Sequence, residues 1–170
     1  TLDPFVALAS AAATTQTLTL TTGVILLSQR DVIYTAKEVA TLDLVCDGRV
    51  VLGVGVGWNR HEMRHHGLDP ATRGAKLNEQ IRALKMIWTQ ETAEFHGDFV
   101  DFSPIFSWPK PVQAPHPPVL MGGDGPKAIE GLLEAVHEEH AVRQARELVV
   151  ERALHQLLLE GLVSADVAGV

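Results

Sequence analysis

The chain has 170 residues, of which 46% are hydrophobic, a formal net charge of −7 and a single cysteine. This length and composition predict one globular domain with a sizeable core. The negative charge and the lack of a Lys/Arg run argue against a nucleic-acid partner, because phosphate backbones are bound by concentrated basic surfaces. No apolar run reaches the roughly 18 residues of a membrane span, and Cys46 has no second cysteine to pair with. We therefore expect a cytoplasmic protein with no membrane partner, which binds a small molecule or another protein.

The first third of the chain predicts a helix, a strand and a second helix. Asp3 and Pro4 are typical of a helix start, and this helix is expected to run to about residue 15. Residues 17–26 alternate and then become wholly apolar, which favours a buried strand. Asp31 can cap the next helix, which ends at a glycine stop, Gly48. The apolar stripe predicted for that helix comprises Val32, Ile33, Ala36, Val39, Ala40 and Leu44.

The next strand, residues 50–58, carries three glycines near its carboxyl end: Gly53, Gly55 and Gly57. Glycine packs nothing and weakens a strand, so three of them indicate that something approaches the backbone closely. The order strand, helix, strand with short joints is the βαβ unit. We therefore expect an α/β fold with a parallel, buried sheet and a right-handed crossover.

The remaining elements are a short helix at 59–66, a long helix at 72–89, a hairpin around Gly97 and Asp98, a proline-rich connector at 109–118 and a strand at 119–121. That strand ends in a second glycine-rich corner, residues 122–125. From Lys127 to about Leu162 the pattern is helical, and no further strand is predicted.

Two glycine-rich corners on one parallel sheet suggest a ligand site. Each corner leads from a strand into a helix start, whose free N–H groups suit a phosphate. The alternative is that the glycines only allow tight turns or close packing. Neither corner has the G-x-G-x-x-G spacing of a dinucleotide fingerprint or the pattern of a Walker loop. Trp58, at the mouth of the first corner, could stack on a planar ring or simply cover the end of the sheet.

Residues 61–65 read His-Glu-Met-Arg-His, which matches the zinc-protease pattern H-E-x-x-H. The metzincin continuation is absent, and Glu79 is the nearest carboxylate that could serve as a third ligand. The helix also breaks early, at residues 67–70. Zinc hydrolysis is therefore kept only as a minor alternative.

Four blocks of sequence form a combined pattern: residues 20–26 with 29–31, residues 36–43 with 48–49, residues 52–59, and residues 71–74 with 95–97 and 117–123. Together they resemble the bacterial luciferase-like monooxygenase family, particularly its branch that depends on the deazaflavin coenzyme F420. The resemblance covers about residues 3–129. It implies a (β/α)8 TIM-type barrel that holds F420, or alternatively FMN, at the carboxyl ends of its strands.

The resemblance also implies which residues bind the cofactor. Gly23 and Val24 would lie beside the ring, at a strand end that often bears a non-proline cis bond or a bulge. The pocket lining would comprise Gly55, Gly57, Trp58 and Asn59, and the phosphate would be received by Gly122, Gly123 and Gly125. The implied activity is hydride transfer or monooxygenation of a small organic substrate, and no catalytic acid or base can be carried over.

The barrel is predicted to be incomplete, because a full one needs roughly 250 residues and only three parallel strands are evident. We expect a partial barrel domain over residues 1–130 and a helical segment over residues 131–170. The open sheet would favour pairing with another copy, as a dimer. A non-catalytic barrel fragment or interaction module is the alternative function.

Overall fold

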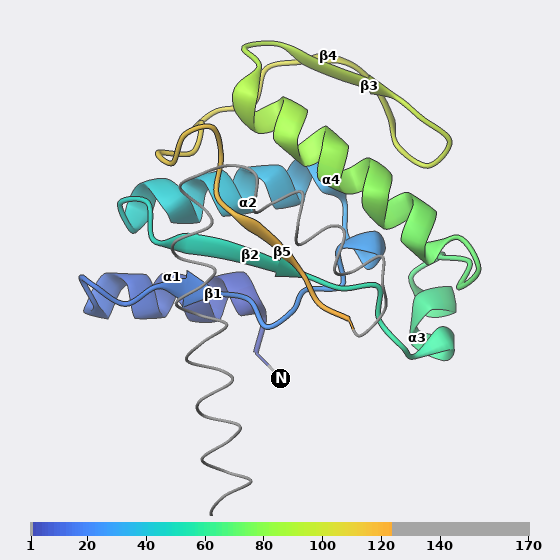
Figure 1. Ribbon diagram of the computed structural model, residues 1–170, viewed down its shortest axis with the longest axis horizontal. Helices are drawn as coiled ribbons and strands as arrows, with labels where there is room; N and C mark the ends of the chain where they lie inside the picture. Colours follow the sequence, from blue (N-terminus) through green and yellow to red (C-terminus); the bar gives the residue numbers. More distant parts are fainter. Residues whose placement is uncertain (1, 124–170) are drawn as a thin grey trace, which may run out of the picture.

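The computed structural model describes residues 2–123 and contains two sheets with helices packed around them (Figure 1). The expected helix after Lys127, the residue Gly125 and the expected segment 131–170 lie outside the described residues. In chain order the elements are α1 (Pro4–Thr14), β1 (Leu20–Thr21), the 3-10 helix η1 (Leu27–Gln29), α2 (Val32–Val45), β2 (Val50–Val54), α3 (Arg60–His65), α4 (Arg73–Thr89), β3 (Ala93–His96), β4 (Asp101–Ile105) and β5 (Val119–Met121).

The main sheet has the strand order β1-β2-β5, and both pairings are parallel, as the βαβ pattern predicts. Leu20 pairs with Val50, and Leu52 pairs with Val119. The central strand β2 is buried over its whole length, because it lies between two strands and α2 packs against it. The three strands run in one direction, so their carboxyl ends meet at one edge of the sheet.

The predicted helix starts are confirmed by their capping bonds. The Asp3 carboxylate accepts the N–H groups of Phe5 and Val6, and the Asp31 carboxylate accepts that of Tyr34. One predicted core position on α2 is wrong: Leu44 is 52% exposed, whereas Leu42 is buried. Leu44 follows Val39 by five residues, which places it roughly 140° further around the helix.

The expected strand over residues 17–26 is also wrong in its length. The ladder with β2 stops after Thr21 and resumes only as an isolated bridge between Ile25 and Val54. Leu20 pairs with Val50 and Ile25 pairs with Val54, so five residue steps along the first strand oppose four along β2. The first strand therefore carries one extra residue between these two pairs. This is a β-bulge, which re-aims the side chains at a strand end.

Two buried carboxylates fix the segments that follow α4. Glu79 accepts the N–H groups of Asp98, Phe99 and Val100, and so holds the turn of the β3–β4 hairpin against α4. Asp43 accepts the N–H groups of Val112 and Gln113, together with the side-chain amide of Gln113, and so holds the proline-rich connector. Figure 1 shows the hairpin on the far side of α4 from the main sheet.

Candidate functional site

The glycine-rich segments expected from the sequence meet at the carboxyl edge of the main sheet. Gly55 follows β2 directly, and its N–H donates to the Ile25 carbonyl at 2.9 Å. Gly122 follows β5, and its N–H donates to the Val54 carbonyl at 2.7 Å. The bulge at Gly23 and Val24 is therefore bordered by the ends of both other strands.

The hydroxyl of Thr22 holds the bulge in place. It accepts the N–H of Gly53 at 2.9 Å and donates to the Gly53 carbonyl at 2.7 Å, so it takes over the backbone pairing that the bulge interrupts. The same carbonyl also accepts the N–H of Ile25 at 2.9 Å. Gly23 and Val24 lie between these two anchors, and the peptide bond that joins them is cis, as the family resemblance implied.

The Val24 side chain rests on a floor of three glycines, Gly53, Gly55 and Gly122. A Cβ atom added to Gly55 would lie 2.7 Å from Val24 Cγ2, and one added to Gly122 would lie 2.9 Å from Val24 Cγ1. A Cβ on Gly53 would lie 3.5 Å from Val24 Cγ1 and would overlap the carbonyl oxygen of Thr22. The close approach predicted from the glycines is thus made by the chain's own bulge. Val24 as a whole remains 43% exposed.

The other expected pocket residues follow β2 in the loop before α3. Gly57 has a φ of +74°, a conformation that glycine adopts readily, and it lies against Leu26 and Met63. Trp58 is 89% exposed. The side-chain oxygen of Asn59 accepts the N–H groups at the start of α3. Gly123 is exposed after β5, whereas Gly125 lies outside the described residues.

The H-E-x-x-H pattern lies on α3, where His61 and His65 are both exposed. Glu79, the carboxylate that could have served as a third ligand, instead binds the hairpin turn. The hydrogen bond from the Phe99 N–H is the largest cause of the lowered pKa of its carboxyl group. Within residues 2–123 no group of three or more histidine, cysteine, aspartate or glutamate side chains is placed to hold a metal ion.

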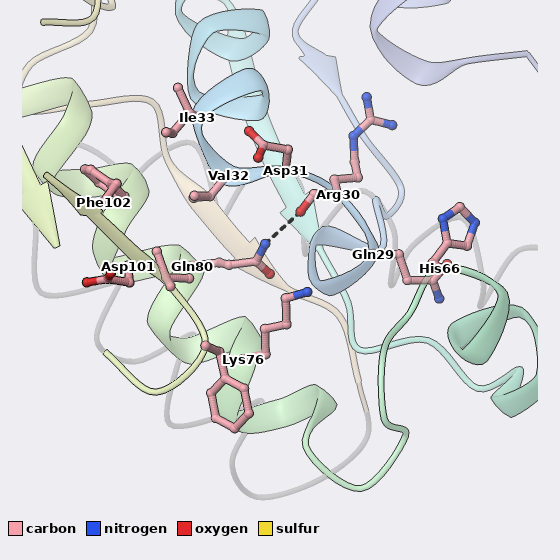
Figure 2. Close-up of a pocket in the computed structure, with 12 residues that line it drawn as sticks. Gln29, Arg30, Asp31, Val32, Ile33, His66, Lys76, Gln80, Asp101 and Phe102 are labelled. Atoms are coloured by element: carbon pink, nitrogen blue, oxygen red, sulfur yellow. Dashed lines mark hydrogen bonds between the residues drawn. The ribbon is translucent and has the colours of Figure 1, made fainter. Parts of the chain in front are cut away.

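A cavity of about 360 Å³ lies elsewhere, between the start of α2, one side of α4 and the hairpin (Figure 2). The Gln80 amide at its wall donates to the Arg30 carbonyl at 2.8 Å, and Lys76 lies beside it. Asp31 and Asp101 also line this cavity, so its charge is mixed. It contains no residue of the glycine floor, and no local sequence pattern could have predicted it because its lining comes from distant segments.

A sequence model of the luciferase-like monooxygenase family matches residues 1–148. The chain belongs to this family. Its members among the relatives below include flavin-dependent and F420-dependent oxidoreductases. The predicted luciferase-like (β/α)8 barrel is confirmed as the fold class, and residues 2–123 form part of it.

Several curated relatives support the family assignment. An uncharacterized protein of Mycobacterium tuberculosis is 49% identical over 125 residues, which cover 74% of this chain and 44% of that protein. The FMNH2-dependent dimethylsulfone monooxygenase of Pseudomonas putida is 44% identical over 91 residues, with 52% and 25% covered. The F420-dependent glucose-6-phosphate dehydrogenase of Amycolatopsis mediterranei is 32% identical over 94 residues, with 54% and 28% covered. The chain therefore spans less than half the length of each of these relatives.

Solved structures of the family share the fold. Monooxygenase RslO1 from Streptomyces bottropensis has a TM-score of 0.67 at 30% identity, and the match covers 70% of this chain and 36% of that one. An F420-dependent secondary alcohol dehydrogenase has a TM-score of 0.67 at 24% identity, and the match covers 75% of this chain and 39% of that one. In the described part of this family member, no helix is both long and apolar enough to cross a membrane.

Proposed function

We propose that this chain contributes part of the cofactor site of an oxidoreductase that uses F420, with FMN as the alternative. The observation that carries the proposal is the half-exposed Val24 bulge, which lies over Gly55 and Gly122 at the carboxyl edge of the parallel sheet. In (β/α)8 barrels, active sites lie at this edge. Relatives named for each of the two cofactors support a ring-binding role without favouring one of them.

The residues at this edge fit a planar ring. The outward face of Val24 is apolar and half-exposed, and it is backed by glycines, so it offers a firm surface for one face of a ring. Trp58 is exposed in the neighbouring loop and can add an aromatic surface beside the aliphatic one of Val24. When bound, the cofactor supplies the hydride or oxygen chemistry. The chain's own residues support the ring and shield that face from water.

The proposed phosphate contacts are the backbone groups after β5. Gly122 and Gly123 are both exposed there; because the Gly122 N–H already donates to the Val54 carbonyl, Gly122 would allow the phosphate to approach its Cα, and Gly123 would supply the backbone N–H. We extend this role to Gly125 on the resemblance alone. Gly55, Gly57 and Asn59 complete the proposed lining. The substrate is proposed to be a small organic molecule that undergoes hydride transfer or monooxygenation, and no acid or base is assigned.

Titration of the purified protein with F420 and with FMN tests this proposal. We expect saturable quenching of the cofactor's fluorescence, with the tighter dissociation constant for F420. A tighter constant for FMN would select the alternative cofactor. A folded sample that binds neither would leave the non-catalytic barrel module as the function.

We also propose that the protein forms a homodimer in the cytoplasm. The apolar groove between α1 and α2 supports pairing, because Val6, Tyr34 and Val45 are exposed along it. Analytical ultracentrifugation tests the dimer, and a concentration-independent monomer would refute it.

We propose further that residues 1–130 and 131–170 are separate units. Limited proteolysis that fails to cut near residue 130 would refute this division.

A further inference from the structure

We infer that Gly55 and Gly122 are positioning residues: they set how far the Val24 side chain projects from the sheet edge, and thereby the space left for a planar ring against it. The packing of the glycines against Val24 follows from the geometry of this chain alone, whereas its consequence for a ring rests on the function proposed above. Their effect on the ring is exerted through Val24, and it is separate from the lining role proposed for Gly55 and the phosphate contact proposed for Gly122.

Val24 has no room to move closer to the glycines beneath it. Added Cβ atoms at Gly55 and Gly122 would lie 2.7 and 2.9 Å from its two methyl groups, and ordinary contacts begin at about 3.4 Å. The side chain therefore already fills the space that the missing Cβ atoms leave. Any side chain at either glycine would have to displace Val24 by several tenths of an ångström or more.

A displaced Val24 side chain can move in one direction, away from the sheet. The backbone on both sides of the bulge is fixed, by the Thr22 hydroxyl bonded to Gly53 and by the N–H of Ile25 bonded to the Gly53 carbonyl. Val24 is 43% exposed, and because its two methyl groups lie against Gly55 and Gly122, we infer that its open side faces away from the glycines. A larger residue at position 55 or 122 would thus push Val24 outward, into the space proposed for the ring.

The need for glycine holds at only some of the chain's glycine positions. Gly74 lies in the first turn of α4, and a Cβ added there would meet nothing within 4 Å. Gly74 therefore provides a matched control. The summed side-chain volume at positions 24, 55 and 122 becomes the quantity that determines whether a ring fits.

A double-mutant cycle between G55A and V24A tests the inference, because removing the two Val24 methyl groups frees the space that the new Cβ needs. We expect G55A to weaken binding of F420 or FMN, whichever the wild type binds, by roughly tenfold or more. In the V24A background the same substitution should change the dissociation constant by less than about threefold. G122A should behave like G55A with a smaller effect, and G74A should bind like the wild type.

The thermal unfolding midpoint of the ligand-free protein provides a readout that does not depend on the cofactor. G55A should lower it, and adding V24A should recover part of the loss, which a merely additive pair would not do. If the wild type binds neither cofactor, the proposed function fails while the unfolding cycle still tests the packing. The inference is overturned if G55A and G122A bind and unfold like the wild type, or if V24A fails to relieve G55A. If G55A does not fold, the same cycle is run with G122A.

Discussion

The substitution G53A probes the anchor of the bulge, because the new Cβ would overlap a backbone atom and not a movable side chain. The atom is the carbonyl oxygen of Thr22, and the two strands must separate to make room for the methyl group. Separation strains both bonds of the Thr22 hydroxyl to Gly53 and the bond from the Ile25 N–H. The damage therefore falls on a fully buried part of the sheet.

The size of the effect follows from these contacts. Overpacking of a tight core costs about 1–3 kcal/mol, and each weakened hydrogen bond adds about 0.5–1.5 kcal/mol. We expect G53A to lower the free energy of unfolding by about 3–5 kcal/mol, a large share of the stability of an ordinary domain. Urea unfolding followed by circular dichroism measures it, with G74A as the control. A loss of less than about 1 kcal/mol relative to the wild type would contradict this expectation.

Three further predictions concern the carboxylates and the hairpin. The completely buried Asp43 carboxylate accepts three N–H groups, two of them from Gln113, and an amide cannot accept all of them. D43N should therefore destabilise the protein by about 2–4 kcal/mol in urea unfolding, and equal stability would contradict this. Backbone hydrogen bonds lower the pKa of Glu79, so the stability that its carboxylate gives the fold is present above the ordinary carboxyl pKa and lost as the pH falls through the lowered value. E79Q should therefore flatten the acid side of a curve of unfolding free energy against pH. An unchanged acid side would be the adverse result. The hydrogen bond to Asp101 raises the pKa of His96, so the stability that this pair gives the fold is present below the ordinary imidazole pKa and lost as the pH rises through the raised value. An NMR titration should place the His96 midpoint higher in the wild type than in D101N. Equal midpoints would count against the pair.

The parts of the fold that local chemistry determines were predictable from the sequence. The caps at Asp3 and Asp31 act on N–H groups two or three residues away, so the helix starts follow from short patterns. The strand at 119–121 was predicted with its observed bounds, because it is a short apolar run between proline and glycine breakers. The hairpin was also predicted, because a Gly-Asp turn lies between two short aromatic runs.

The bulge could not be predicted from local patterns. It depends on the Thr22 hydroxyl taking over a backbone pairing with Gly53, 31 residues away. For the same reason the glycines indicated a close approach without identifying Val24 as the group that approaches. The role of Asp43 was hidden too, because its partners lie about 70 residues further along the chain.

We propose above that the carboxyl edge of β1, β2 and β5 binds a planar flavin or deazaflavin ring. Glycine-selective ¹⁵N labelling and two-dimensional NMR during titration with F420, and separately with FMN, test it most directly. We expect the amide signals of Gly23, Gly55 and Gly122 to shift as the ligand binds, while those of Gly67 and Gly74 stay in place. Saturable binding that leaves the first three signals unmoved, or no binding of either cofactor by the folded protein, would contradict it.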